Sequence, residues 1–268
     1  MSQTRYPFLN VSIDTLSSHE ILEKIKKYLI APQKFIHIVS INPENCVIAN
    51  YNSTFRTVCN ESDLALIDGV GVLLGAKMLN VPVHGRTTGA LLFERLLKVA
   101  GEMSLAVLLI GAQANLADSI AKCYSRGYPE ARFIGINGYK DIMHPTKEEE
   151  EALLSIVRAT RPRIVFSAFG SPAQELWFYS HKDMFKDIIC MGVGGGFNYV
   201  AGASKQPNKY IRQFGLEWLY RLITEPGRWY RQCTRLPYFI YLVLAAKIRS
   251  ILAKTNSTPH GKTPIYRP

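Results

Sequence analysis

The chain of 268 residues is 47% hydrophobic and 20% charged, so it can bury a full core in one large domain or in one domain with an appendage. It has no apolar run near the ~18 uncharged residues of a spanning helix, and its first ten residues lack a signal-peptide pattern, so we expect a cytoplasmic protein. The net charge of +11 is uneven: residues 205–268 hold twelve Lys or Arg and two acids, whereas residues 1–204 hold twenty and nineteen. The C-terminal part should therefore meet an anionic partner, such as a phosphate substrate, acidic lipid or nucleic acid.

Metal sites and disulfides are not expected. The five cysteines are scattered and form no C-x-x-C, and the six histidines form no H-x-x-x-H or Cys/His cluster. We therefore predict reduced thiols, no metal and no cofactor.

Short apolar stretches alternate with helical patterns over the first 200 residues. The expected strands are 8–13, 35–39, 64–67, 105–110, 131–135, 163–168 and 187–192. The expected helices are 17–30, 43–59, 88–100, 114–126 and 146–160. This alternation predicts right-handed crossovers and a Rossmann-like, mainly parallel sheet with flanking helices.

Polar residues follow several of the expected strands. In "SINPENCVIAN" (40–50), Ser40 and Asn42 lie in a turn before a helix that should begin at Pro43, a position where ligands sit in open α/β sheets. Asp68 ends "LALID" and precedes two glycines, so it could act on a ligand or cap a helix over 69–79. Arg86, in "HGRTTGA", could pair with Asp68 or with a phosphate, or be an ordinary surface arginine.

Three further strand–turn–helix segments follow. The segment 108–117 has one glycine where a dinucleotide fingerprint needs three, and no P-loop lysine follows. "FSAFGSPAQE" (166–175) places Gln174 and Glu175 beside a helix N-terminus suited to anions. "GVGGGFNYVAG" (192–202) is a glycine-rich loop that can approach a phosphate or base edge, or simply form a tight turn.

Other classes of chemistry find less support. G-x-S-x-G is absent, which speaks against a nucleophile elbow, and D-x-D is also absent. A sugar-nucleotide enzyme built on this chain would lack the usual carboxylate pair for Mg²⁺. The basic C-terminal segment would have to neutralise the leaving group instead.

The pattern changes after Gly202. The stretches 209–224 and 227–252 are rich in Arg and aromatic residues and are interrupted by Pro226 and Pro237. "LPYFIYLVLAAKI" (236–248) is too short to span a bilayer, and fits either a core helix or an interfacial helix. Its basic flanks favour the membrane surface. We therefore expect a catalytic domain over 1–204, a basic amphipathic appendage over 205–257 and a disordered tail over 258–268.

Seven segments between residues 8 and 245 resemble the WecG/TagA/CpsF glycosyltransferases in order and spacing. They are "SINPEN", "ALIDGVGV", "GRTTGA", "IGAQ", "FGSPAQE", "GVGGGFN" and "GLEWLYRLITEPGRWYRQ". The resemblance implies a Rossmann-like fold and an inverting, metal-independent transfer of sugar. The donor would be a UDP-sugar and the acceptor a polyprenyl-diphosphate-linked saccharide of bacterial cell-surface polysaccharide synthesis. It also implies peripheral association with the inner face of the cell membrane, with no nucleic acid partner; homo-oligomerisation is left open.

The resemblance also assigns residues. Asp68 matches the position of the family's general base, which deprotonates the acceptor hydroxyl. Ser40 and Asn42 match the family's T-x-N motif, with Ser40 in place of the Thr. Gln174 stands in the turn near the sugar, and Asn198 stands where many members have Asp. The arginines similar to those that close over the site are Arg221, Arg228 and Arg231.

Two non-catalytic alternatives use the same basic segment. Arginines interleaved with Tyr and Trp also fit a nucleic-acid binder, and the apolar stretch fits a membrane-docked scaffold. Asp68 and the glycine loops favour an enzyme over both.

Overall fold

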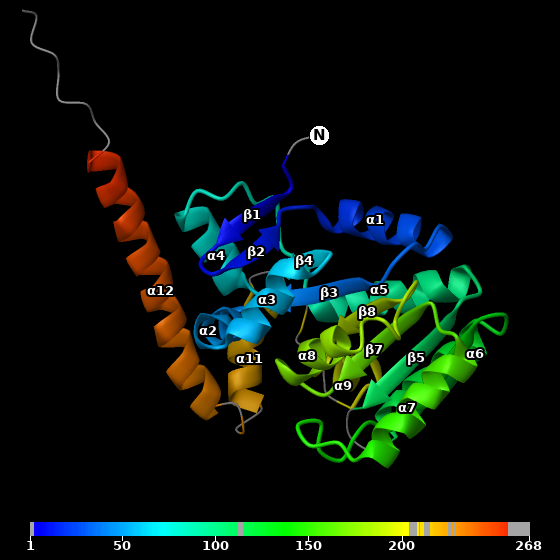
Figure 1. Ribbon diagram of the computed structural model, residues 1–268. Helices are drawn as coiled ribbons and strands as arrows, with labels where there is room; N and C mark the ends of the chain where they lie inside the picture. Colours follow the sequence, from blue (N-terminus) through cyan, green and yellow to red (C-terminus); the bar gives the residue numbers. More distant parts are fainter. Residues whose placement is uncertain are drawn as a thin grey trace, which may run out of the picture.

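The computed structural model of the protein describes residues 3–111, 115–203, 208, 210–211, 215–224, 227 and 229–256. Within them, a parallel six-stranded sheet with the order β4-β3-β8-β7-β5-β6 forms the centre (Figure 1). Its strands are β3 (Ile36–Ile41), β4 (Leu64–Ile67), β5 (Ala106–Gly111), β6 (Arg132–Ile136), β7 (Ile164–Ala168) and β8 (Ile189–Gly192). The predicted Rossmann-like parallel sheet is thus confirmed.

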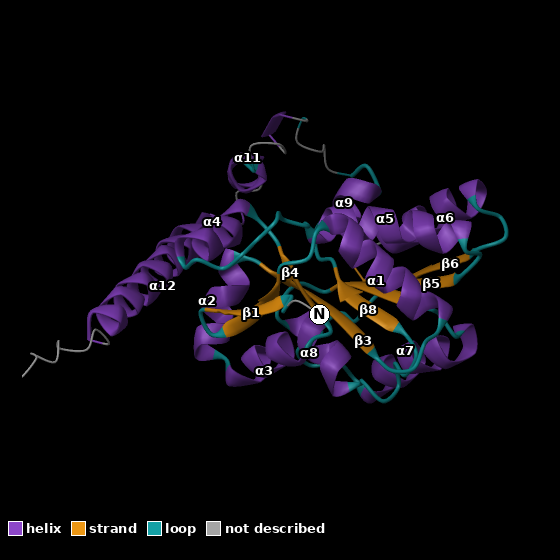
Figure 2. Cartoon of the chain, turned by 90° about the horizontal axis from the view of Figure 1, so that it is seen from above, coloured by secondary structure: helices purple, strands orange, loops and turns teal. Residues whose placement is uncertain are grey.

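Helices cover both faces of this sheet (Figure 2). One face packs against α1 (Ser18–Ile30), α5 (Gly89–Glu102), α6 (Leu116–Gly127) and α9 (Gly196–Val200). The other face packs against α2 (Pro43–Tyr51), α3 (Ser53–Glu61), α7 (Lys147–Thr160) and α8 (Ala173–Ser180). The strands are therefore buried on both sides, as parallel strands are in α/β proteins.

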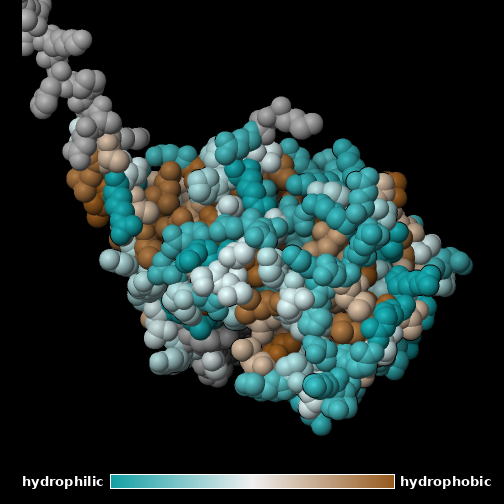
Figure 3. Space-filling view, in the orientation of Figure 1, coloured by the Kyte–Doolittle hydropathy of each residue, from teal (hydrophilic) through white to brown (hydrophobic). Residues whose placement is uncertain are grey.

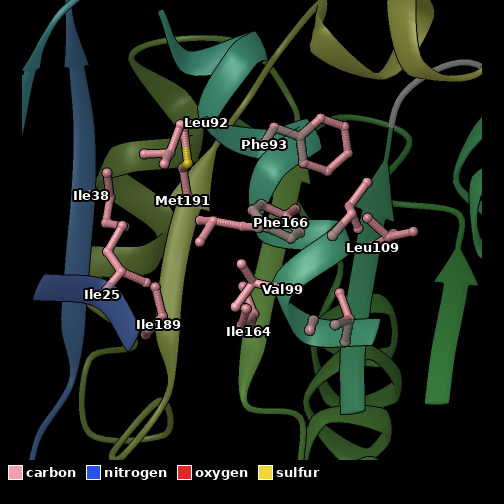
Figure 4. Packing of buried hydrophobic residues seen from close by; sticks show 14 of the residues in the cluster. Ile25, Ile38, Leu92, Phe93, Val99, Leu109, Ile164, Phe166, Ile189 and Met191 are labelled. Atoms are coloured by element: carbon pink, nitrogen blue, oxygen red, sulfur yellow. The ribbon is translucent and has the colours of Figure 1, made fainter. Parts of the chain in front are cut away.

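Close packing between α5 and the central strands fixes where α5 begins. Leu92 and Phe93 of α5 lie over Phe166 and Met191 of β7 and β8 (Figure 4). The rings of Phe93 and Phe166 meet edge to face with centroids 4.7 Å apart. Burial of each such side chain contributes about 1.5–3 kcal/mol, so the start of α5 is held firmly against the sheet.

The expected strand over 8–13 is a hairpin instead. Strands β1 (Arg5–Phe8) and β2 (Val11–Asp14) pair antiparallel, and the chain turns at Leu9, which has a φ of +52°. The hairpin packs against the edge strand β4, where Asp14 Oδ2 accepts a hydrogen bond of 2.6 Å from Ala65 N–H. An apolar run alone did not reveal the turn within it.

The expected helix over 43–59 is divided in two. Asn52 ends α2 and caps α3, because its side chain accepts a hydrogen bond from Phe55 N–H. Likewise, Thr146 caps α7 and forms a capping box with Glu149. Asparagine is a strong N-cap, and here its side chain outcompetes continuation of the helix.

The C-terminal region contains α11 (Glu217–Thr224) and a long helix, α12 (Trp229–Asn256). Pro237 lies inside α12, so the predicted interruption there is wrong. Phe239 and Val243 are buried against α2, α4 (Val70–Met78) and the hairpin, and these contacts hold the helix straight past the proline. The predicted tail over 258–268 lies outside the described residues.

The apolar part of α12 is longer than the sequence suggested. The stretch Gln232–Ala253 is long and apolar enough to cross a membrane by length and composition, and 11% of it is buried. A core helix would be mostly buried, so this helix is not one. Apolar residues gather over α12 at the left edge of the molecule in Figure 3.

Candidate active site

The carboxyl ends of neighbouring parallel strands meet at one edge of the sheet. Ile41 of β3 pairs with Ile67 of β4, and Asp68 N–H donates to the carbonyl of Ile41 over 2.9 Å. On the other side of β8, Val193 N–H donates to the carbonyl of Ser167 over 2.8 Å. This edge is the usual ligand-binding position in an open α/β sheet.

Asp68 and Ser40 come together at the first turn of α5. Gly89 N–H, at the start of that helix, lies 3.4 Å from Asp68 Oδ2. A Cβ on Gly89 would lie 2.7 Å from Ser40 Oγ, so only glycine fits here without a shift. The helix that follows Asp68, α4, has Gly69 at its N-cap and no side-chain cap, so the capping alternative for Asp68 is not what the structure shows.

Ser40 has a buried hydroxyl. Its side chain is 9% exposed, and its Oγ has no hydrogen-bond partner within the described residues. A buried hydroxyl normally finds a partner, because leaving it unpaired costs about 1–3 kcal/mol. The Ser40 hydroxyl lies close to Asp68, since a Cβ on Gly89 would be near both side chains.

Asn42 caps α2. Its Oδ1 accepts a hydrogen bond of 2.8 Å from Asn45 N–H, and Pro43 occupies the first helical position, as predicted. The side-chain oxygen of Asn42 therefore has a local structural role at the mouth of the site.

Asn45 is a site residue that the sequence reasoning missed. It is 2% exposed, its Nδ2 donates to the carbonyl of Ser40 over 2.7 Å, and its Oδ1 accepts from Ser171 Oγ over 3.0 Å. It thus joins the end of β3 to the turn after β7. The signal for it was a polar side chain at the start of the apolar helix "CVIAN".

Gln174 is buried beneath the turn after β7. Its Oε1 accepts from Gly170 N–H over 3.1 Å, and its Nε2 donates to Glu175 Oε1 over 2.8 Å. A Cβ on Gly192 would lie 2.3 Å from Gln174 Nε2, so the first glycine of the glycine-rich segment makes room for this side chain. Burial raises the pKa of Glu175, whose side chain is 1% exposed.

The rest of the glycine-rich segment turns into α9. Gly194 has a φ of +46° and open space where a Cβ would be, as expected of a loop that can approach a ligand. Asn198 is half-buried in α9, and its neighbour Phe197 stacks on Phe93 of α5 with centroids 5.3 Å apart. This stacking places α9, and Asn198 with it, on the α5 side of the sheet.

Arg86 forms an ion pair with the appendage. Its two terminal nitrogens lie 2.5 and 3.3 Å from the carboxylate oxygens of Glu217, the first residue of α11. The sequence had suggested Asp68 or a phosphate as its partner; Glu217 was not considered. The pair fixes α11 beside the loop that leads into α5.

The structure describes two of the three arginines that the resemblance predicts to close over the site. Arg221 belongs to α11 and Arg231 to α12, whereas Arg228 lies outside the described residues. On the same helix α12, Arg235 forms an ion pair with Glu44 in the first turn of α2. The appendage thus contacts the body at both α2 and the loop before α5.

The arrangement brings the Asp68 carboxylate, the Ser40 hydroxyl and a buried amide network to one sheet edge, with α11 held to the loop before α5 and α12 to α2. In the described part of the chain, no group of three or more His, Cys, Asp or Glu side chains is placed to hold a metal ion. A carboxylate at such an edge can accept a proton from a bound hydroxyl.

Comparison with known proteins decides the family. The model of the "Glycosyl transferase WecG/TagA/CpsF family" matches residues 6–252, which is most of the chain. The protein belongs to the WecG/TagA/CpsF family. It is therefore a glycosyltransferase, and the non-catalytic alternatives are set aside.

Two relatives of this WecG/TagA/CpsF protein carry the same name, N-acetylglucosaminyldiphosphoundecaprenol N-acetyl-beta-D-mannosaminyltransferase. The one from Staphylococcus aureus is 28% identical over 249 residues, which is 92% of this chain and 94% of the relative. The one from Bacillus spizizenii is 32% identical over 207 residues, or 77% and 78% of the two chains. By their names, both relatives act on an acceptor sugar linked through a diphosphate to undecaprenol.

Proposed function

We propose that the protein transfers a sugar from a UDP-sugar to a polyprenyl-diphosphate-linked saccharide, with inversion and without a metal ion. The names of the relatives make N-acetylglucosamine linked to diphosphoundecaprenol the first acceptor to test, and N-acetylmannosamine the first sugar. The observation that carries the proposal is the carboxylate of Asp68 at the sheet edge, beside Ser40 and the first N–H of α5.

In this mechanism the acceptor hydroxyl attacks the anomeric carbon while the bond to UDP breaks. Asp68 takes the hydroxyl proton, and UDP leaves with the bonding electron pair. Gly89 N–H holds one oxygen of the Asp68 carboxylate, which orients the group toward the acceptor. Ser40 and Asn42 would line the pocket, and Gln174 would position the sugar.

The position of the carboxyl groups near this edge supports a single displacement, in which the sugar is transferred in one step with inversion. A double displacement with retention would use a carboxylate nucleophile close to the reacting carbon. Glu175, which follows Gln174 in α8, is 1% exposed and accepts a hydrogen bond from Gln174, so it does not fit that role. In the proposed single displacement Asp68 serves as the base, and the acceptor attacks from the face opposite UDP.

The appendage would supply the positive charge that other enzymes take from Mg²⁺. Negative charge builds on UDP as it departs, and arginines stabilise it more in the transition state than in the ground state. Arg221, Arg228 and Arg231 are the candidates for this role, and Arg86 positions α11 beside the site.

We also propose that residues 205–257 dock the catalytic domain, residues 1–204, to the inner face of the cell membrane. Phe239 and Val243 bind α12 to the body, while its outer side exposes large apolar residues. Crossing the bilayer would pull α12 away from these contacts and from its ion pair with Glu44. A helix lying on the surface keeps them and brings the site to the lipid-linked acceptor.

The test is UDP release from a panel of UDP-sugars with a short-chain prenyl-diphosphate N-acetylglucosamine acceptor, with and without EDTA. We expect turnover with at least one N-acetylhexosamine donor and no loss on chelation. Loss of turnover that Mg²⁺ or Mn²⁺ restores would contradict the metal-free mechanism. If none of the UDP-sugars is hydrolysed or used for transfer, the choice of a UDP-sugar as donor is contradicted.

A further inference from the structure

Glu175 is a carboxyl group that the protein buries completely. It is the third residue of α8 and is 1% exposed. Its Oε1 accepts a hydrogen bond from Gln174 Nε2, whereas its Oε2 has no partner within the described residues. Among those residues, no lysine, arginine or histidine forms an ion pair with it. An ionised carboxylate without a cation would cost several kcal/mol in such a place.

The hydrogens of its neighbours are already committed. Ser171 has one hydroxyl hydrogen, which it donates to Asn45 Oδ1, and Asn45 Nδ2 is turned toward the carbonyl of Ser40. Gly170 N–H donates to Gln174 Oε1 and so turns Gln174 Nε2 toward Glu175. The Ser171 hydroxyl, which also lies near Glu175, points its hydrogen toward Asn45 Oδ1, and Glu175 Oε2 is left without a hydrogen-bond partner among the described residues.

A protonated carboxyl group fits these surroundings and an ionised one does not. The protonated acid accepts from Gln174 with one oxygen and carries its hydrogen on the other, which then needs no cation beside it. Burial raises the pKa of Glu175, and hydrogen bonding from Gln174, from Ser171 and from the backbone of Glu175 itself offsets only part of that effect. Cys59 of α3 is a titratable group close to Glu175, and the charged Arg5 of β1 lies close to Cys59. His37 of β3 packs against Phe178 of the same helix α8, and Cys190 of β8 lies in the same core cluster as Phe178.

We propose that Glu175 is a neutral acid that positions Gln174 and the Gly170–Ser171 turn at the carboxyl ends of β7 and β8. It acts on the reaction through Gln174 and does not itself touch the substrate. This inference rests on the proposed function in one respect, because it assigns Gln174 to the sugar side of the site.

Matched variants separate the proposed role from simple packing. Glu175→Gln keeps the shape, stays uncharged and still accepts from Gln174, so kcat and KM should stay unchanged. Glu175→Leu fills the volume but leaves the Gln174 amide unpaired, and the KM for the donor should rise by about tenfold or more. Glu61→Gln, at an exposed glutamate that also contacts α8 through Tyr179, serves as the control and should change nothing. A folded but inactive Glu175→Gln, or a fully active Glu175→Leu, overturns the proposal.

A second measurement needs no substrate. The infrared carbonyl band of a protonated carboxylic acid should be present at pH 7 in the protein and lost in Glu175→Gln. Absence of that band overturns the proposal even if the enzyme transfers sugar. Its presence in a protein without transferase activity would instead count against the proposed function alone. This readout also decides the question if Glu175→Leu does not fold.

The pH dependence of stability gives the same protonation state independently. The unfolded chain releases the Glu175 proton above its ordinary pKa of 4.5, whereas the folded protein keeps it. Above pH 4.5 the unfolded state therefore binds fewer protons than the folded state. The measured quantity is the unfolding free energy of the protein minus that of Glu175→Gln. This difference should fall as the pH rises from 4.5 to the raised pKa of Glu175 in the folded protein. Urea unfolding at several pH values measures this difference; a difference that is constant or grows with pH overturns the proposal.

Discussion

At the scale of single residues, the proposed mechanism depends on Asp68. Asp68→Asn keeps the shape and can still accept from Gly89 N–H, but it cannot take a proton from the acceptor. Donor binding should be retained while turnover falls by at least ~10²-fold, the lower range for general-base catalysis. Calorimetry with the donor and a UDP-release assay measure the two quantities, with exposed Asp183→Asn as the control. Turnover near that of the unmodified protein would remove Asp68 from the mechanism.

Gly89 should tolerate no side chain. In Gly89→Ala the new Cβ would lie 2.7 Å from Ser40 Oγ and 3.6 Å from Asp68 Oδ2, so the floor of the site must shift. Overpacking of this kind costs about 1–3 kcal/mol of unfolding free energy. The double variant Gly89→Ala with Ser40→Ala removes the clashing oxygen and should recover most of the loss in urea unfolding. Equal losses in the single and double variants would show that the clash is not the cause.

The sequence was informative about residues at strand ends and less so about their partners. Asp68 and Ser40 could be named because the carboxyl end of a parallel strand points to a ligand. Asn45 could not, because its role depends on Ser171, which is distant in sequence. The partner of Arg86 was missed for the same reason, since Glu217 lies 131 residues away.

At the scale of elements, the pair of Arg86 and Glu217 holds α11 to the body. Two parallel hydrogen bonds join the partly buried side chains. A double-mutant cycle with Arg86→Gln and Glu217→Gln should give a coupling of about 1 kcal/mol in unfolding free energy. Each single variant should also lower turnover. A coupling of zero would mean that α11 is held by other contacts.

The outer side of α12 should bind lipid. Tyr241, Leu244 and Ile248 are 60%, 47% and 57% exposed and follow one another at helical spacing. Replacing all three by Gln should weaken binding to anionic vesicles by at least about tenfold, since each loses apolar area buried in the membrane. The matched control is Ile30→Gln, which changes a 74% exposed residue on α1. Vesicle binding that stays the same in the triple variant would contradict the docking role.

Elements were predicted well where periodicity was the only determinant. The six strands of the sheet and helix α7 with its cap follow from local pattern. Failures occurred where a single side chain or a tertiary contact decided the outcome. Asn52 divides a helix by capping, and the burial of Phe239 and Val243 carries α12 past Pro237.

At the scale of the whole molecule, the fold class was predictable and the placement of the appendage was not. Alternating strands and helices imply a parallel sheet and its ligand-binding edge. Nothing local in the sequence indicated that α12 would pack along α2 and α4 while α11 approached the loop before α5. Contacts between distant segments set these positions, so they required the structure.

One consequence follows from how near Arg86 lies to Gly89. Only two residues lie between Arg86, which forms the ion pair with α11, and Gly89, whose N–H group holds Asp68. Under the proposed docking, a bilayer that steadies α11 would also steady the Asp68 carboxylate, and the membrane would act as an allosteric effector. Such coupling is reciprocal by thermodynamic necessity. Saturating UDP should then raise the affinity for vesicles by the same factor by which vesicles raise the affinity for UDP, and Arg86→Gln should abolish both effects.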